Sequence, residues 1–137
     1  MSGFEGLHAG IATNRSEFYR NVAAGPFYNF DQPGTTRSEA VIDNWWRQGM
    51  MGAANAQYDC VTAFIEDDWT EDLKRITVPV LVMNGDADQI VPYASSGLRA
   101  VELLKNGTLK TYAGFPHGMP TTHADTINKD LLAFIES

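Results

Sequence analysis

The sequence has little of what marks several large classes of protein. Its 137 residues include one cysteine, Cys60, so an intrachain disulfide is impossible and a reducing compartment is compatible. The ten lysines and arginines are scattered rather than gathered in a run, and the net charge is −7. Because nucleic acids and anionic membranes are polyanions that require basic patches, we expect neither as a partner.

Long hydrophobic runs are also missing. No stretch approaches the roughly 20 apolar residues of a membrane-spanning helix. The opening residues, MSGFEGLHAG, hold no basic segment followed by a long apolar one, so no signal peptide is predicted and we expect a cytoplasmic location. With 44% apolar and 20% charged residues, the composition is that of a globular domain or part of one.

Helical periodicity is typical of the first half of the chain. A helix is predicted over residues 3–24 because apolar residues recur there at spacings of three, four or seven: Phe4, Leu7, Ile11, Phe18 and Val22. Glycine and proline interrupt the pattern over 25–34. Two more helices are predicted over 36–51 and 53–66, with a short helical turn around 70–75.

The periodicity changes at residue 78. The predicted elements there are a strand over 78–83, a helix over 94–105 that ends at the pair Asn106-Gly107, a strand over 108–113, and a last helix starting near Thr121 or Thr122. The run VPVLVM is typical of a parallel strand buried on both faces. A strand–helix–strand unit requires parallel strands and a right-handed crossover, so the predicted fold class is α/β.

The two loops that follow these strands contain the candidate catalytic residues. Asp86 and Asp88 lie after the first strand, and His117 lies in the loop 114-GFPHGMP-120 after the second. In open parallel sheets, function gathers beyond the carboxyl ends of the strands. A carboxylate that accepts a hydrogen bond from one imidazole nitrogen fixes the tautomer and stabilises the imidazolium. The loops therefore predict an acid paired with a general base.

Each member of this pair has a competitor. Asp86 directly follows Gly85 and is the better candidate for capping the turn, whereas Asp88 lies further into the loop and can reach sideways. His117 is favoured over His123, which is expected in the first turn of a helix, and over His8 far upstream.

A metal site is a further hypothesis. Two carboxylates at the spacing of Asp86 and Asp88 can hold Mg²⁺ or Mn²⁺. No third ligand lies nearby in the sequence, so we favour the pairing with histidine and predict no metal and no cofactor.

Several blocks of the sequence agree in order and spacing with one family. They are GPFYNF, IDNWWRQGMMGA, YDCVTAF, GDADQIVP, GFPHGM followed by TTHA, and NKDLLAFI. Together they resemble the α/β-hydrolase superfamily, and more narrowly its cofactor-free haloperoxidase, perhydrolase and aryl-esterase branch. The resemblance covers essentially the whole chain.

The resemblance implies roles for particular residues. Asp88 would be the acid of a catalytic triad and His117 its general base, while Phe27, Phe64 and Ile90 would line the substrate pocket. Residues 1–70 would form a helical cap, and residues 71–137 the C-terminal β-α-β-α part of the hydrolase core. The substrate would be a small ester or carboxylic acid.

The nucleophile of that family has no counterpart here. It is a serine in the motif Gly-x-Ser-x-Gly, and none of the serines has glycine at both minus two and plus two: Ser2, Ser16, Ser38, Ser95, Ser96 and Ser137. Cys60 is a poor substitute, because it is predicted on an apolar helical face where a thiol stays protonated. We therefore expect a C-terminal fragment of a serine hydrolase, without nucleophile or oxyanion hole and inactive alone.

A fragment of this kind needs a partner. Two strands make a marginal sheet with an open edge, so we expect a homo-oligomer or association with the missing N-terminal half. The alternative function is a non-catalytic fragment that self-associates, or a half that complements an N-terminal segment in trans.

Overall fold

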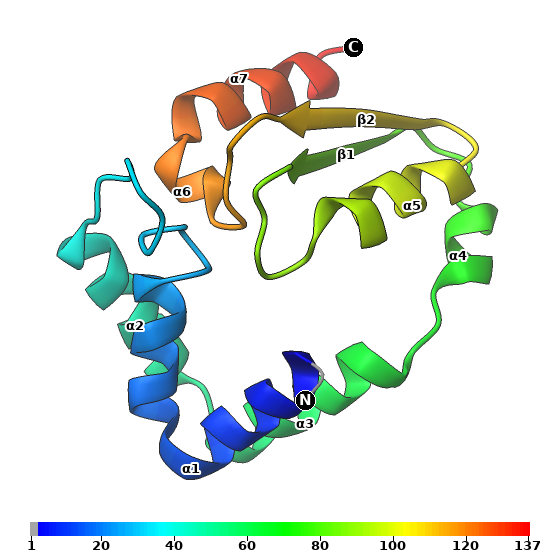
Figure 1. The fold of residues 1–137 in the computed structure, drawn as a ribbon. Helices are drawn as coiled ribbons and strands as arrows, with labels where there is room; N and C mark the ends of the chain where they lie inside the picture. The colour runs from blue at the N-terminus through cyan, green and yellow to red at the C-terminus, as the bar shows by residue number, and fades with distance from the viewer. Residues whose placement is uncertain (1–2) are drawn as a thin grey trace.

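The computed structural model describes residues 3–137, with side chains from residue 6 onward, and its chain traces an open ring (Figure 1). One side of the ring consists of the helices α1 (Gly3–Ala24), α2 (Glu39–Met51) and α3 (Ala54–Glu66). A two-stranded sheet with its own helices forms the other side. The short helix α4 (Thr70–Arg75) lies between the two sides.

Helix α1 has the predicted extent but consists of two segments. At Asn14 the backbone leaves the helical region, with φ −154° and ψ 81°. Oδ1 of Asn14 accepts a hydrogen bond from the N–H of Glu17 (3.2 Å), and its amide donates to the Glu17 carboxylate (3.1 Å). Asn14 thus acts as the N-cap of the second segment. Of the predicted apolar face, the Phe4 side chain lies outside the described residues.

Helices α2 and α3 differ in how far their residues are buried. Ser38 accepts a hydrogen bond from the N–H of Val41 (3.4 Å), so α2 begins at Glu39 rather than near residue 36. None of the residues of α3 is buried, and the Phe64 side chain is 64% exposed. Cys60 is exposed too, so the apolar surroundings expected for its thiol are absent from the described part of the chain.

The sheet confirms the predicted α/β arrangement. Strand β1 (Val80–Gly85) runs parallel to β2 (Gly107–Tyr112), in a register from Val80 opposite Gly107 to Gly85 opposite Tyr112. Both strands therefore end together. Helix α5 (Gly97–Leu103) makes the crossover, and it lies on the opposite face of the sheet from α7 (Ala124–Ile135) (Figure 1). Residue 78, predicted inside the first strand, lies before it and is 62% exposed.

The predicted helix over 94–105 is wrong at both ends. Ser96, with φ −128° and ψ −89°, separates a short 3₁₀ turn, η1 (Tyr93–Ser95), from α5. Its hydroxyl donates to the carbonyl of Pro92 (2.8 Å), which holds the chain out of the helix. Asn106 and Gly107 do not cap α5: the Asn106 amide donates to the carbonyl of Thr77 (2.7 Å), and Gly107 opens β2.

The last predicted helix is also divided. Its first turn is a separate helix, α6 (Met119–Thr122), and α7 follows after His123, whose φ of −131° breaks the regular backbone. Thr121 and Thr122 therefore lie inside α6 and are not N-caps of the long helix.

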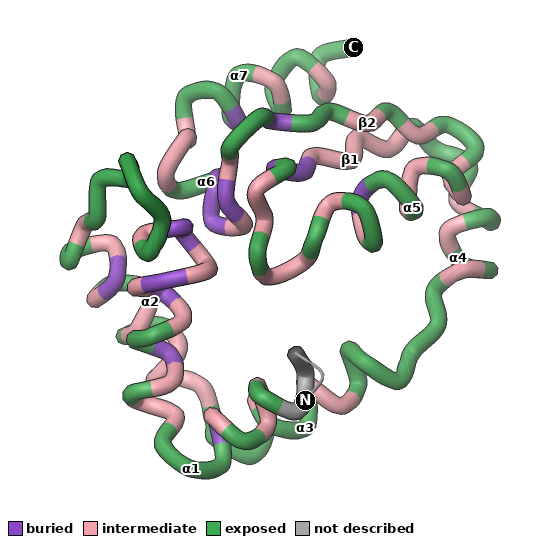
Figure 2. The backbone as a smooth tube through the Cα atoms, viewed as in Figure 1, coloured by how far each residue is buried: buried purple, intermediate pink, exposed green. Residues whose placement is uncertain are grey.

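The buried apolar residues form two small clusters, one on the helical side and one beside the sheet (Figure 2). The first, Ala23, Tyr28 and Ile42, joins α1 to α2, and the second, Tyr112, Met119 and Ile127, joins β2 to α6 and α7. Helices α3 and α4 have no buried residues. The domain boundary at residue 70 stays a prediction. Among residues 3–137, no helix has the length and apolar character that crossing a membrane requires.

Candidate active site

The ends of β1 and β2 bring Asp88 and His117 together. Oδ2 of Asp88 lies 2.8 Å from Nδ1 of His117. Because the strands are parallel and end in register at Gly85 and Tyr112, the loops that follow them leave the sheet side by side. The pair predicted from the sequence is therefore in hydrogen-bonding contact, although its catalytic role stays a prediction.

The carboxylate of Asp88 is held on both oxygens. Oδ1 accepts hydrogen bonds from the backbone N–H groups of Ile90 and Val91, each at 2.8 Å, and Oδ2 faces the imidazole. The Asp88 side chain is 7% exposed. Backbone donors on one oxygen and the imidazole on the other satisfy a carboxylate that water can hardly reach, and they fix its orientation.

Asp86 has a different function from the turn cap that was predicted for it. Its Oδ1 accepts a hydrogen bond from the N–H of Gly114 (2.6 Å), at the start of the loop that carries His117. Gly114 has φ +76°, a conformation that glycine adopts without strain. Asp86 thus ties the second loop to the first, while the turn itself is closed by the N–H of Asp88 on the carbonyl of Gly85 (3.4 Å).

His117 presents its second nitrogen away from the carboxylate. Nδ1 faces Asp88, so the hydrogen on Nδ1 makes Nε2 the basic nitrogen of a neutral ring. Within residues 6–137 no hydrogen bond to Nε2 is formed. The imidazole side chain is 33% exposed, and the ring of Phe27 meets it edge-on with centroids 4.9 Å apart. Nε2 is free to exchange a proton with a reacting group.

The other two histidines are engaged elsewhere. His123 stacks on Phe115 with ring centroids 3.7 Å apart, and its Nδ1 lies 2.9 Å from the hydroxyl of Thr122. Nε2 of His8 lies 3.2 Å from the carbonyl of Tyr58, on the helical side. Neither contacts Asp88, so the geometry distinguishes the three predicted candidates.

A hollow of about 590 Å³ opens at the acid–base pair. Apolar side chains dominate its wall, which includes Phe64, Trp69, Met83, Val91, Ala100, Met119 and Pro120 beside Asp88 and His117. Of the three residues predicted to line a substrate pocket, Phe64 is in this wall. Phe27 instead packs edge-on against the imidazole of His117, and the backbone N–H of Ile90 donates a hydrogen bond to Asp88. The hollow could accept a small, largely apolar molecule next to Nε2.

No family model matches the chain, but individual proteins do. It is 59% identical over 134 residues to the bifunctional esterase/perhydrolase DCH of Acinetobacter calcoaceticus, and 56% identical over 134 residues to a non-heme chloroperoxidase of Streptomyces lividans. Each match covers 98% of this chain and 49% of the relative. The chain is homologous to half of an α/β-hydrolase of this group.

Solved structures agree with this relationship. The bromoperoxidase of Bacillus anthracis superposes with a TM-score of 0.90 at 30% identity, over 98% of this chain and 48% of that one. An esterase of Exiguobacterium antarcticum superposes with a TM-score of 0.86 at 17% identity, which shows the shared fold. The chain thus spans about half the length of the α/β-hydrolases it matches, and it corresponds to their C-terminal half.

Two polar residues of this α/β-hydrolase half were missed from the sequence. Asn84 ends the apolar run of β1, is buried, and lines the hollow. Its Oδ1 accepts hydrogen bonds from the Ser96 hydroxyl and the Gly97 N–H, each at 3.2 Å. Ser96 also lines the hollow, yet its hydroxyl bonds to Asn84 and to backbone carbonyls rather than to His117. A polar residue at the end of an apolar run was the available signal.

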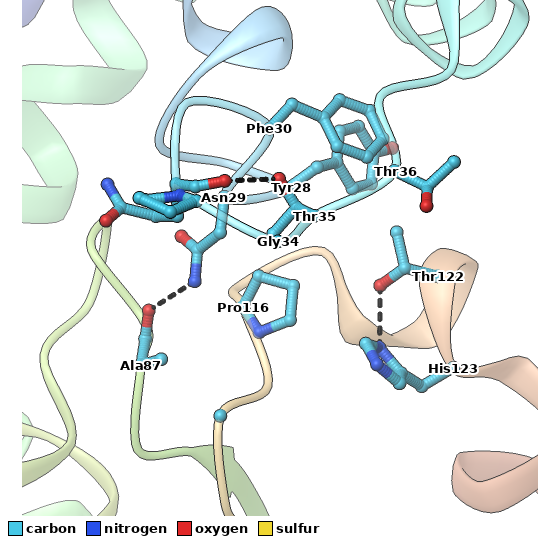
Figure 3. Close-up of a pocket in the computed structure, with 13 residues that line it drawn as sticks. Tyr28, Asn29, Phe30, Gly34, Thr35, Thr36, Ala87, Pro116, Thr122 and His123 are labelled. Atoms are coloured by element: carbon cyan, nitrogen blue, oxygen red, sulfur yellow. Dashed lines mark hydrogen bonds between the residues drawn. The ribbon is translucent and has the colours of Figure 1, made fainter.

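A second hollow, of about 560 Å³, is lined by the turn after α1 and by residues of both loops (Figure 3). Its wall includes Tyr28, Asn29, Thr35, Pro116 and His123, but neither Asp88 nor His117. His123 is bonded there to Thr122, as the figure shows. The aspartate–histidine contact therefore lines the first hollow and not the second.

Proposed function

We propose that this chain supplies the acid and the general base of an esterase or perhydrolase active site, and that the nucleophilic serine comes from the half of the hydrolase fold that it does not match. The observation that carries the proposal is the 2.8 Å contact between Asp88 and His117. It joins a buried, backbone-held carboxylate to an imidazole whose second nitrogen has no partner among the described side chains.

The proposed reaction uses each atom of the pair. Nε2 of His117 takes the proton of the serine hydroxyl as the serine oxygen attacks the acyl carbon of a small ester. The imidazolium then returns that proton to the departing alkoxide, which leaves an acyl-enzyme. Asp88 stabilises the imidazolium through Nδ1–H without taking the proton.

The second half of the reaction sets the product. When water attacks the acyl-enzyme, with His117 again as base, the product is a carboxylic acid. When hydrogen peroxide attacks instead, the product is a peracid, and the peracid can oxidise a halide ion to hypohalous acid while becoming the carboxylate. The relatives are named for these activities: esterase/perhydrolase and chloroperoxidase.

The nucleophile is the part that this chain does not offer. Its sequence has no Gly-x-Ser-x-Gly motif, and the hydroxyl of Ser96, the serine at the hollow, is committed to Asn84 and to backbone carbonyls. A base without a nucleophile or oxyanion donors loses most of the catalytic effect, because these groups act as a unit. We therefore propose that residues 1–137 are inactive by themselves.

The test is a chimera that joins the N-terminal half of the Acinetobacter enzyme to this chain, assayed on p-nitrophenyl acetate. We expect hydrolysis that falls by on the order of 10³-fold or more in His117→Ala. The matched control His123→Ala removes a histidine with no contact to Asp88 and should retain activity. A folded chimera with no activity, or one indifferent to His117→Ala, would sink the proposal.

A second candidate function is a non-catalytic one. Large apolar side chains are uncovered just before β1 and on α7: Val78 is 62% exposed, Leu132 55% and Ile135 68%. In the part of the chain that the structure describes, β1 pairs with β2 and has no neighbour on its other edge. Such surfaces favour self-association or docking of a complementary half. Activity of the chimera separates this candidate from the catalytic one.

A further inference from the structure

The segment from Phe27 to Asn29 joins the helical side of the molecule to both active-site loops. It belongs to the turn after α1, and through Tyr28 it is part of the first buried cluster. Its side chains and carbonyls reach across to residues on either side of the acid–base pair. Nothing in the proposed chemistry uses these residues directly, so their contacts need a separate explanation.

The side chain of Asn29 forms hydrogen bonds with the residues on both sides of Asp88. Its amide Nδ2 donates to the carbonyl of Ala87 at 2.8 Å, the contact drawn in Figure 3. Its Oδ1 accepts a hydrogen bond from Nε2 of Gln89 at 2.7 Å. One buried side chain, 5% exposed, is thereby bonded to the neighbour before Asp88 and the neighbour after it.

The backbone of Asn29 is arranged for this contact. Among residues 3–137 it is the one non-glycine residue with positive φ, at 55°. Asparagine tolerates this left-handed conformation better than most residues do. A residue in that conformation persists when the surrounding structure requires it, and such positions cluster at functional sites.

The same segment also holds the histidine loop. The carbonyl of Phe27 accepts a hydrogen bond from the N–H of Gly118 at 2.7 Å, one residue after His117. A side chain at position 118 would overlap the ring of Tyr28, so glycine permits this close approach. The ring of Phe27 then meets the imidazole edge-on.

We propose that Asn29 is a positioning residue for the Asp88–His117 pair, and this inference rests on the proposed function of that pair. By bonding to Ala87 and Gln89, Asn29 fixes the loop between them and with it the distance from Oδ2 of Asp88 to Nδ1 of His117. Asn29 touches neither the substrate nor the reacting atoms. It acts through the aspartate loop and couples the geometry of the pair to the helical side of the molecule.

Two variants at position 29 isolate the contacts. Asn29→Asp keeps the shape and the acceptor for Gln89 but loses the donor to Ala87, while Asn29→Gly accepts the positive φ and loses both contacts. The readout in the 137-residue chain is the proton NMR signal of His117 Nδ1–H, which lies far downfield when a carboxylate holds it. We expect the signal to weaken in Asn29→Asp and to disappear by exchange in Asn29→Gly.

The matched control is Trp46→Phe. It removes a hydrogen bond on the helical side, from the Trp46 indole to the carbonyl of Ser16 (3.1 Å). The contacts of Asn29 with Ala87 and Gln89 are left in place. The downfield signal should survive in this variant. An unchanged signal in both position-29 variants would overturn the proposal, and so would its loss in Trp46→Phe while the fold is retained.

A third variant covers the case in which Asn29→Gly does not fold, as judged by circular dichroism. Gln89→Ala removes one of the two contacts from an exposed side chain, and a fully preserved signal there would then overturn the proposal. In the chimera, we expect Asn29→Asp to lower kcat by on the order of tenfold to a hundredfold with KM nearly unchanged. An inactive chimera whose NMR signal still responds to position 29 would reject the proposed function while leaving the positioning role intact.

Discussion

Oδ2 of Asp88 lies 2.8 Å from Nδ1 of His117, although the two residues are 29 positions apart in the sequence. Parallel strands that end in register bring them together, and three further anchors hold the loops. Asp86 binds the N–H of Gly114, Asn29 binds both neighbours of Asp88, and the carbonyl of Phe27 binds Gly118. Both loops that carry the pair are thus hydrogen-bonded to each other and to the turn after α1.

Replacing Asp88 by asparagine in the chimera should abolish most of the activity. Asparagine can present its amide to the imidazole, which reverses the tautomer and places the hydrogen on Nε2, where the base must be free. We expect kcat to fall by on the order of 10²–10⁴-fold. The measurement is steady-state hydrolysis of p-nitrophenyl acetate.

The matched control for this change is Asp86→Asn, which alters the other aspartate of the loop. Asp86 contacts Gly114 and not His117, so we expect its loss to cost roughly tenfold or less. Equal losses in both variants would contradict the assignment of Asp88 as the acid.

The 137-residue chain should self-associate at micromolar concentration. Leu132 and Ile135 project from α7 uncovered, and burying them against another surface is favourable. Light scattering after size exclusion should give a mass above that of one chain, and Leu132→Lys with Ile135→Lys should lower it. Asn128→Lys places one such charge at an exposed polar position of α7 and should leave the mass unchanged. A clean monomer for the unaltered chain would refute the expectation.

Acid should weaken the fold through Asp130. Its carboxylate accepts hydrogen bonds from Lys110 (2.6 Å) and from the Tyr112 hydroxyl (2.7 Å), and these hold the pKa of Asp130 below its usual value of 3.8. A carboxyl group whose pKa is lower in the folded than in the unfolded chain stabilises the fold above its unfolded pKa. That contribution is lost as the pH falls through the folded pKa.

The measurement for Asp130 is urea unfolding at neutral pH and at successively lower pH. The free energy of unfolding should fall less steeply in Asp130→Asn than in the unaltered chain, because the variant carries no titrating group at that position. An identical slope in the two proteins would show that the contacts of Asp130 with Lys110 and Tyr112 do not contribute.

Local signals in the sequence were enough for most elements. The apolar spacing predicted α1, α2 and α3, and the run VPVLVM predicted a parallel strand. The expected burial on both faces was wrong, because residues 80–83 are only partly buried in this two-stranded sheet. Boundaries failed where a side chain binds the backbone. Asn14 interrupts α1, and α2 and α5 begin after Ser38 and Ser96, later than predicted. Each of these side chains forms a hydrogen bond with a nearby backbone group that competes with the helical hydrogen bond.

The contact between Asp88 and His117 was predictable for a related reason. Residues that directly follow neighbouring parallel strands must lie at one edge of a sheet, so the positions of Asp88 and His117 along the chain already indicated their contact. The function of Asp86 was not predictable in the same way. Its hydrogen bond with the N–H of Gly114 depends on the distance between the two loops, which the sequence pattern does not give.

The sequence by itself determined the class of fold, the order of its main elements, and the aspartate and histidine that follow its two strands, because these depend on periodicity and on neighbours along the chain. Only the tertiary structure decided which side chains surround that pair. Phe64 lines the hollow, while Phe27 packs against the imidazole. Asn29 forms hydrogen bonds with Ala87 and Gln89, which lie far from it in the sequence. Such contacts join residues far apart in the chain, and their geometry is set by packing, on which periodicity carries no information.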